Sequence, residues 1–406
     1  MESINLLISD ETLRDGEQQV GLFFENKAEL AQLIAQTGVH QIALMPAIHA
    51  SEAQLVEDLV AGECKQQVIA STLMKRSAID QSKACGVQQV ILFHAVSDRL
   101  LFLRDSAIAA HPALKHKTID ANVCPQLINQ SIEQSRQTML TNALAHVKYA
   151  TQQGLRVCFA AEDASRADFS FLVDCINTLG PYIEHFLLCD TVGILTPEKT
   201  YSWIQRLLRQ TSVPLCVHFH NDMGLALENT IQAVKAGALG ISSTMGGIGE
   251  RAGNAPLEQV LYGLRSRFGW QVDGIDYDAL DRVVAYLHER GHRPHPPYSP
   301  QAQRHESGIH VSSLLRDPKS YAIFKHDRPE IWFGKCSGAS NFRYLFEYHL
   351  KRPLAQAEYE RLRAVIKAIA LKEKRSYSVA DVLTLIESEG LLAADLLTNG
   401  KANQRP

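Results

Sequence analysis

Short apolar runs alternate with helix-like stretches along the first two thirds of the chain. Each run is followed by polar or turn residues, as buried parallel strands are. The eight runs occupy residues 6–9, 41–45, 68–73, 90–95, 157–161, 186–190, 215–219 and 240–243. Because helix-like stretches separate the runs in a regular series, they favour a (β/α)8 barrel over an open sheet.

The intervening stretches supply the helices of this barrel. Apolar residues recur at helical spacing over residues 27–36, 51–60, 170–178, 197–210 and 226–236. Residues 98–135 are the exception, because their polar stretch 111–122 shows no clear period. We therefore predict an extended loop over the barrel mouth in this interval.

The pattern changes after the eighth run. Residues 275–290 have helical periodicity, and the stretch 291–300 that follows contains prolines that cannot continue a helix. Helical patterns return at residues 355–372 and 378–388. The predicted organisation is a barrel domain, residues 1–274, and a linker with a mostly helical appendage, residues 275–406.

Composition is that of an ordinary globular protein. The chain has 406 residues, 46% hydrophobic and 21% charged, and 41 Lys and Arg against 44 Asp and Glu give a formal net charge of -3. No basic excess points to nucleic acid or to an anionic membrane, and no apolar run could span a bilayer. The N-terminus lacks a secretory pattern, and the eight cysteines form no CxxC pair. We expect a cytoplasmic protein with reduced thiols.

A charged segment follows the first predicted strand. Residues 10–18 read Asp-Glu-Thr-Leu-Arg-Asp-Gly-Glu-Gln and bring four carboxylates, an arginine and a glycine together. In a barrel this position lies on the catalytic face. A solvated charged loop is the alternative interpretation.

His218 and His220 end the seventh predicted strand. Residues two apart on a strand point to the same face, so the two imidazoles are spaced for chelation. With one carboxylate they would form a site that holds a divalent metal and keeps positions open for a substrate. Zn, Mn, Mg, Fe and Co are all chemically possible, and a core or surface histidine pair is the alternative.

Three further segments carry candidate chemistry. The Gly-rich stretch 245–254 would let backbone approach a ligand, although it lacks the Lys-Ser/Thr pair of a phosphate loop. Glu162, within residues 160–166, would serve near a metal as an acid, a base or an orienting group. The polar segment 304–310 lies outside the barrel and is followed by Tyr321. The alternatives are a glycine-rich turn, a paired surface carboxylate and a polar loop, in that order.

Taken along the chain, these segments resemble a known family. The motifs are Asp-x-Thr-Leu-Arg-Asp-Gly-Glu-Gln, His-x-His-Asn-Asp-x-Gly, Gly-x-Gly-Glu-Arg-x-Gly-Asn and His-Glu-Ser-Gly-Ile-His. The set resembles the homocitrate synthase and 2-isopropylmalate synthase family, metal-dependent barrel enzymes that condense acetyl-CoA with a 2-oxo acid. Residues 162–166 are most similar to the nitrogen-fixation type of homocitrate synthase. The resemblance spans residues 6–340 approximately.

The resemblance also implies roles for individual residues. Asp15, His218 and His220 would bind one divalent metal, with Asn254 as a neighbouring or additional ligand. Arg14 would polarise the ketone oxygen of the 2-oxo acid. The remaining implied roles are contact with the 2-oxo acid for Gln18 and Thr191, assistance to catalysis for Glu162, and proton transfer for His310 with Tyr321 near it.

The sequence departs from the family around the acceptor. Lysine-pathway homocitrate synthases carry an arginine four residues before the catalytic glutamate, where this chain has Cys158, and Cys336 stands where relatives have histidine. A dicarboxylate such as 2-oxoglutarate needs a cation for its distal carboxylate. Lys75 and Arg76, at the end of the third strand, are the nearest basic candidates by topology. Solvated residues at a helix start are the alternative.

Homocitrate formation from 2-oxoglutarate and acetyl-CoA is the predicted function, with citramalate, 2-isopropylmalate or a specialised 2-alkylmalate as the alternative product. A 3-hydroxy-3-methylglutaryl-CoA lyase or an aldolase is less favoured, because the lyases carry a cysteine in the Gly-rich loop that residues 245–249 lack. The intact metal set speaks against a degenerate binding barrel. An appendage that supplies His310 would normally reach a neighbouring subunit, so the resemblance implies a domain-swapped homodimer.

Overall fold

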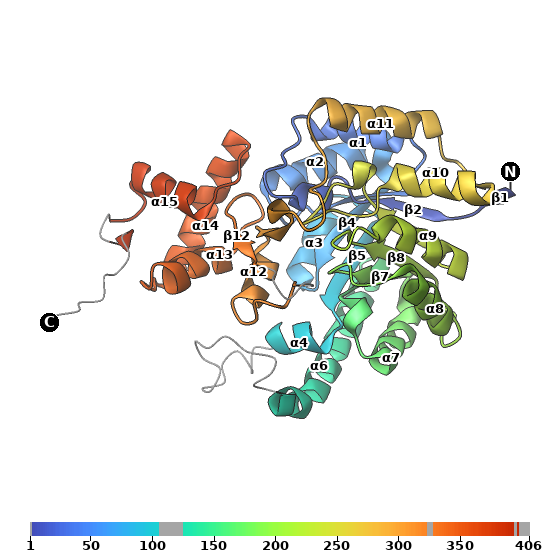
Figure 1. Cartoon of the computed structure of the whole chain (residues 1–406), viewed down its shortest axis with the longest axis horizontal. Coiled ribbons are helices and arrows are strands. Elements are labelled where there is room, and N and C mark those ends of the chain that lie inside the picture. Colours follow the sequence, from blue (N-terminus) through green and yellow to red (C-terminus); the bar gives the residue numbers. More distant parts are fainter. Residues whose placement is uncertain (1, 105–124, 323–327, 394–395, 398–406) are drawn as a thin grey trace.

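A closed barrel of eight parallel strands forms the larger part of the molecule (Figure 1). The fold comes from a computed structural model, which describes residues 2–104, 125–322, 328–393 and 396–397, with the backbone alone at 125–130. Around the barrel the strands are β2 (Leu7–Asp10), β3 (Gln41–Leu44), β4 (Val68–Leu73), β5 (Gln89–Ala95), β6 (Arg156–Glu162), β7 (Phe186–Asp190), β8 (Leu215–Phe219) and β9 (Gly240–Ser243). The predicted (β/α)8 barrel is confirmed.

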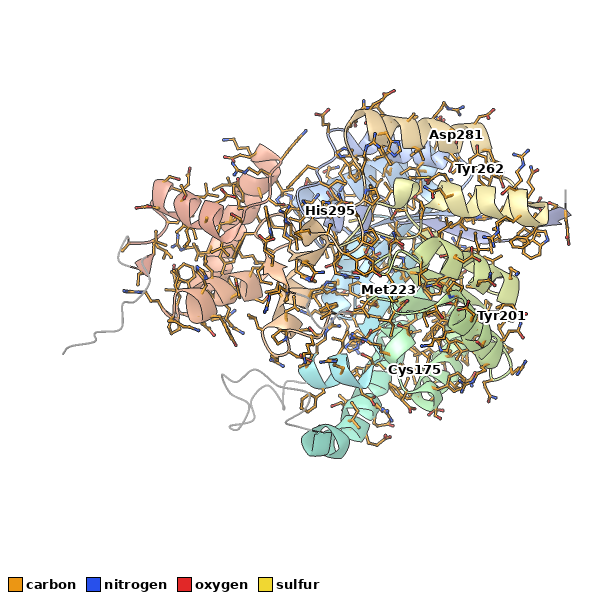
Figure 2. All side chains as sticks on the ribbon, in the orientation of Figure 1. Cys175, Tyr201, Met223, Tyr262, Asp281 and His295 are labelled. Carbon is orange, nitrogen blue, oxygen red and sulfur yellow. The ribbon has the colours of Figure 1, made fainter. Side chains whose placement is uncertain are left out.

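Helices surround the strands, as the periodicity predicts. They are α1 (Lys27–Ala35), α2 (Ala50–Ala61), α3 (Arg76–Ala84), α4 (Asp98–Arg104), α6 (Pro125–Gln152), α7 (Phe169–Leu179), α8 (Pro197–Leu208), α9 (Ala226–Ala236) and α10 (Leu257–Phe268). Local signals set several ends: the Asp168 side chain accepts the backbone N–H of Phe171 at the start of α7, and Gly237 ends α9 with φ 107°. In Figure 2, the labelled Tyr201 of α8 lies at the outer surface.

The predicted extended loop at residues 98–135 is wrong where the structure describes it. Asp98–Arg104 form α4, and α6 begins at Pro125; residues 105–124 lie outside the described part of the chain. Helix α4 has no amphipathic period because it is buried on both sides. Leu101 belongs to the barrel core, whereas Leu100 and Leu103 belong to the core of the C-terminal appendage.

The segment after the barrel begins with a helix that packs on the barrel. Helix α11 (Tyr277–Glu289) confirms the helix predicted at residues 275–290, and its buried Leu280 and Val283 join the barrel core. Outside the barrel, the short strands β1 (Glu2–Ile4) and β10 (Trp270–Val272) pair with each other, which the sequence pattern did not predict. By packing, α11 groups with the barrel, and the division at residues 274 and 275 stays a prediction.

The appendage is mostly helical and has its own hydrophobic core. Its helices are α12 (Gly308–Leu314), α13 (Ala339–Arg343), a π turn (Tyr344–His349), α14 (Gln356–Glu373) and α15 (Val379–Ser388), and the strands β11 (Arg304–His305) and β12 (Glu330–Ile331) form a small parallel pair. Phe342, Phe346 and Leu362 are buried in this core. Figure 1 shows α13, α14 and α15 beside the barrel, with α12 and α4 between them.

Among the described residues, no helix is both long and apolar enough to cross a membrane. The seven cysteines described are free thiols, and all but Cys336 are buried.

Candidate active site

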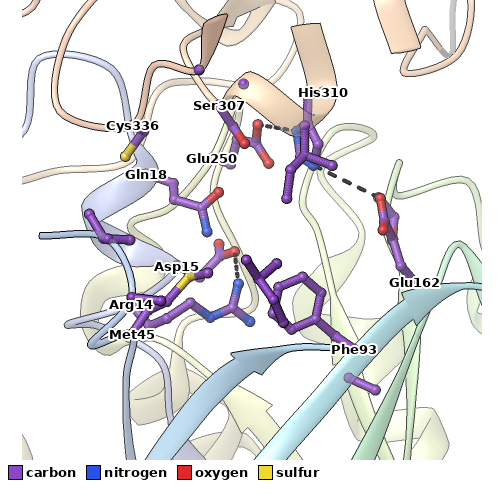
Figure 3. A pocket seen from close by; sticks show the side chains of 18 of the residues that line it. Arg14, Asp15, Gln18, Met45, Phe93, Glu162, Glu250, Ser307, His310 and Cys336 are labelled. Carbon is purple, nitrogen blue, oxygen red and sulfur yellow. Dashed lines mark hydrogen bonds and ion pairs between the residues drawn. The ribbon is translucent and has the colours of Figure 1, made fainter. Parts of the chain in front are cut away.

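A cavity of about 340 Å³ lies where the carboxyl ends of the barrel strands meet the appendage. Barrel strand ends and the loops after them form most of its wall. The appendage covers it with the start of α12, with Cys336 and Gly338, and with two side chains of α14. Figure 3 shows Arg14, Asp15 and Gln18 on one side of the cavity, Glu162 on the other, and His310 and Ser307 above. The candidate motifs therefore meet in one place.

Asp15, His218 and His220 lie close enough to bind one ion. One ligand atom from each falls within 4.8 Å of the others, and all three side chains are buried. Asp15 follows β2, whereas His218 is on β8 and His220 directly after it, and only β9 lies between these two strands in the closed barrel. The two imidazole rings stand nearly perpendicular, at 86°, with centroids 5.0 Å apart. Two imidazoles and a carboxylate suit a divalent transition metal.

The charge states of these groups also suit a cation. Burial lowers the pKa of His220 to about 3 and also lowers the pKa of His218, which keeps both imidazoles neutral and able to coordinate. Burial raises the pKa of Asp15, but His220, which is protonated at the acidic pH where Asp15 titrates, and Arg14 outweigh burial and hold that pKa below its usual range. The set is thus one carboxylate and two neutral imidazoles at neutral pH.

Two buried atoms beside this set have no hydrogen-bond partner among the described residues. They are His220 Nδ1 and Asn254 Oδ1. Asn254 donates from Nδ2 to Asp15 Oδ2 at 2.6 Å, so its amide oxygen is the atom left for another ligand. Gly249 keeps space open here, because a Cβ on it would lie 2.1 Å from Asn254 Nδ2 and 2.8 Å from Asp15 Oδ2. These residues fit a bound divalent cation.

Arg14 lies beside Asp15 and faces the cavity. Its Nε contacts Glu11 Oε2 at 2.7 Å, and its Nη1 donates to Asp15 Oδ1 at 3.0 Å. Both contacts fix the plane of the guanidinium, and the side chain lines the cavity. Gln18 lines the cavity on the same side. A fixed cation at this point is placed to stabilise an oxyanion.

The appendage brings a second group of polar side chains to the cavity. His310 Nδ1 contacts Glu250 Oε1 at 2.5 Å, and its Nε2 lies 4.0 Å from Glu162 Oε1. The His310 ring stacks on Tyr321 with centroids 4.1 Å apart. The Tyr321 hydroxyl donates to Glu162 Oε1 at 2.9 Å. The structure thus brings Glu162, His310 and Tyr321 together, and it adds Glu250, which the motif analysis placed only within a Gly-rich stretch.

Arg104 is a site residue that the sequence analysis missed. It donates to both carboxylate oxygens of Glu162 and, at 2.7 Å, to the Tyr321 hydroxyl. Burial raises the pKa of Glu162, but Arg104 outweighs burial and lowers that pKa to about 2. Glu162 is therefore an ionised, anchored carboxylate. No motif signals Arg104, because its position depends on the unpredicted helix α4.

The other predicted substrate contacts divide into two groups. Thr191 lines the cavity, and its hydroxyl accepts the backbone N–H of Asp163 at 2.8 Å. Lys75 and Arg76 do not reach the cavity: both are exposed at the start of α3, and the Arg76 guanidinium lies over the Tyr149 ring. The prediction that Lys75 or Arg76 supplies the cation for a distal carboxylate is therefore wrong. Both are solvated residues at a helix start, which is the alternative interpretation.

The wall along β3 to β6 is largely apolar. It contains Met45, Leu73, Phe93 and Ala160, while Cys158 is buried in the barrel interior and does not line the cavity. The lining cations besides Arg14 are Arg363 and Lys367 of α14. The sequence did not indicate that Arg363 and Lys367 line the cavity, because they reach it only where a helix of the appendage folds back over the barrel.

His310 lies over the barrel of its own chain in this structure. The linker packs along the same barrel: Gln19 Nε2 donates to the Arg293 carbonyl at 2.8 Å, and the His292 ring meets the Phe24 ring at 5.2 Å. The predicted delivery to a partner's barrel is therefore not needed to complete the site. The homodimer itself stays a prediction.

The chain belongs to the HMGL-like family, whose sequence profile matches residues 5–109 and 103–285. Among curated relatives, 2-isopropylmalate synthase 2 of Caldanaerobacter subterraneus subsp. tengcongensis is 30% identical over 410 residues, covering 97% of each chain. Homocitrate synthase AksA of Methanopyrus kandleri is 31% identical over 402 residues, covering 95% of this chain and 94% of the relative. The predicted resemblance is thereby confirmed.

A solved structure shows the same fold. The HMG-CoA lyase from Brucella melitensis superposes with a TM-score of 0.54 at 16% identity, covering 70% of this chain and 98% of the lyase. At this identity the similarity concerns the fold alone. The two synthases, in contrast, align along nearly the whole chain, including the appendage that carries His310.

Proposed function

We propose that this protein is an acyltransferase that condenses acetyl-CoA with a 2-oxo acid and then hydrolyses the thioester. One observation carries the proposal: a candidate metal-binding set with Arg14 beside it shares one cavity with His310 of the appendage, which contacts the Glu250 carboxylate. The similarity to 2-isopropylmalate and homocitrate synthases supports the same reaction class. When bound at Asp15, His218 and His220, a divalent cation supplies Lewis-acid stabilisation of the ketone oxygen.

We assign removal of the methyl proton of acetyl-CoA to His310. Because the carboxylate of Glu250 accepts the Nδ1 proton of His310, Nε2 carries the lone pair and is the basic atom. Nε2 removes a proton from the methyl group of acetyl-CoA, and the methyl carbon then attacks the ketone carbon. The C–C bond forms as the π electrons of the ketone move to its oxygen. Arg14 is placed to stabilise this developing alkoxide.

The alkoxide takes up a proton, and water cleaves the thioester to release the CoA thiol. The products are a 2-hydroxy acid that carries a new carboxymethyl group and free CoA. Because Arg104 holds Glu162 ionised, Glu162 and Tyr321 orient His310 and stabilise its imidazolium when it forms.

The acceptor is the finer part of the proposal. Homocitrate formation from 2-oxoglutarate remains one candidate, with cations available on α14. The apolar wall of Met45, Leu73 and Phe93 favours a second candidate, an acceptor with an uncharged side chain such as the precursors of citramalate or 2-isopropylmalate.

The test is CoA release from acetyl-CoA by the metal-loaded protein against a panel of 2-oxo acids. Pyruvate, 2-oxobutyrate, 2-oxoisovalerate and 2-oxoglutarate form the panel, and 3-hydroxy-3-methylglutaryl-CoA is the lyase control. We expect release that depends on one acceptor class and is lost in His310→Ala. Cleavage of the lyase substrate without any acceptor-dependent release would overturn the proposal.

A further inference from the structure

Two cations of the appendage line the cavity from one face of α14. Arg363 and Lys367 are four residues apart on this helix, so their side chains share a face. The Arg363 side chain is 42% exposed and contacts Glu360, one turn earlier on the same helix, at 2.9 Å. Lys367 lies deeper, and its Nζ donates to the Ile48 carbonyl in the loop after β3 at 2.8 Å. This pair therefore marks the rim of the cavity next to β3.

Lys367 has no ion-pair partner among the described residues. Its neighbouring carboxylates are engaged elsewhere: Glu52 is bound to Lys27 at 2.6 Å, and Glu306 accepts the backbone N–H of Cys336 and the hydroxyl of Ser376. Burial lowers the pKa of Lys367, which is the cost of holding an ammonium here without an anion. Arg14, the lining cation that the barrel supplies, differs from Lys367 because it has ion-pair partners, Glu11 and Asp15.

We propose that Lys367, with Arg363 beside it, forms an anion-binding subsite that takes an acidic group of a substrate other than the carboxylate next to the ketone. This inference rests on the proposed function for the identity of the substrates. The anion is a carboxylate or a phosphate: either the distal carboxylate of a dicarboxylic 2-oxo acid or a phosphate of CoA. Either anion would supply the ion-pair partner that Lys367 lacks and would accept a charge-assisted hydrogen bond from it at the rim of the cavity.

The experiment compares Lys367→Met, Lys367→Arg and the matched control Lys372→Met. Lys372 is an exposed lysine on the same helix, outside the cavity. Calorimetry gives the Kd for CoA, adenosine 3′,5′-bisphosphate, 2-oxoglutarate and 2-oxobutyrate, and steady-state assays give the KM for each substrate. Direct binding needs no turnover, so it tests the subsite even if no condensation occurs.

We expect Lys367→Met to weaken binding of one anionic probe by about 10- to 100-fold, as loss of a charge-assisted hydrogen bond does. Weaker binding of 2-oxoglutarate alone would identify the distal carboxylate, and weaker binding of CoA and the bisphosphate would identify the phosphate. Binding of 2-oxobutyrate should stay unchanged, which shows that the variant is folded, and Lys367→Arg should recover most of the affinity.

Two results would overturn the subsite. One is unchanged affinity for every anionic probe in Lys367→Met. The other is an equal loss in Lys372→Met, because that would reflect the general field of the helix. Absence of condensation with every acceptor in the unmutated protein, together with weakened probe binding in Lys367→Met, would refute the proposed function and support the subsite.

Discussion

Arg104 of α4 forms a bidentate ion pair with Glu162 of β6 through both terminal nitrogens of its guanidinium. Nη1 lies 2.6 Å from Oε2, and Nη2 lies 2.7 Å from Oε1. The same Nη2 donates to the hydroxyl of Tyr321, which stacks on His310. One arginine therefore holds the groups around the candidate base, and we regard it as a positioning residue.

Replacing this arginine should change the pH dependence of the reaction. In Arg104→Gln the burial of Glu162 is opposed only by His310 and the Tyr321 hydroxyl, so its pKa should rise from about 2. The carboxylate that is ionised at mildly acidic pH in the native protein would then become protonated as the pH falls. We expect the acid limb of kcat to move upward by at least about one pH unit, equivalent to ~1.4 kcal/mol.

Arg99→Gln is the matched control, since Arg99 lies on the same helix and contacts Asp317 instead. Arg104→Lys should give an intermediate profile, because it keeps the charge and loses the bidentate contact. An unmoved acid limb in Arg104→Gln, or the same shift in Arg99→Gln, would contradict the assigned role.

His218→Ala should remove the metal and the activity together. The variant loses one of two imidazoles, so metal content measured by mass spectrometry should fall well below one ion per chain. Turnover should fall by about 10³ or more, the equivalent of several kcal/mol of lost charge stabilisation. A chelator should inactivate the native protein, and added divalent ion should restore it.

The control is His146→Ala, on α6 outside the cavity, which should keep metal and turnover. One ion per chain together with full turnover in His218→Ala would remove His218 from the site.

Arg14→Lys should separate the chemistry from metal binding. Lysine keeps the positive charge but cannot contact Glu11 and Asp15 with a planar fork, so the cation is no longer held in place. We expect kcat to fall by about 10² with unchanged metal content. A fall of less than about threefold, under ~1 kcal/mol, would mean that Arg14 does not stabilise the reaction.

The placement of His310 over its own barrel can be tested by mixing inactive variants. His310→Ala and Arg14→Ala should both be inactive, and the structure places both residues in one cavity of one chain. We therefore expect mixtures to stay inactive after subunit exchange has been demonstrated with tagged chains. If the appendage instead brings His310 to a partner's barrel, random exchange should restore about a quarter of native activity, because half of the dimers would have one intact site of two.

The barrel and the pairing of His218 with His220 could be predicted because both depend on local patterns, whereas Asp15 was implied as the third candidate ligand by the family resemblance. Each strand is a short buried run, and Asp15, His218 and His220 occupy the ends of strands that the barrel brings together. The alternation of runs and helices therefore fixed not only the fold but also the edge at which these side chains meet.

The rest of the site depends on packing between distant segments. Helix α4 is buried between two cores and so lacks the period that identifies a helix, which hid Arg104. Lys367 reaches the cavity only because α14 folds back over β3. Conversely, Lys75 and Arg76 are near the strand ends in sequence, but they point to solvent at the start of α3.

The central claim is that this cavity joins an acetyl carbon to the ketone of a 2-oxo acid. The most direct measurement is mass spectrometry of the product formed from acetyl-CoA labelled with ¹³C in both acetyl carbons and each unlabelled 2-oxo acid. We predict a 2-hydroxy acid that contains both labelled carbons, formed in equal amount to free CoA. Release of CoA with labelled acetate alone, or no labelled adduct with any acceptor while the protein holds its metal, would contradict the claim.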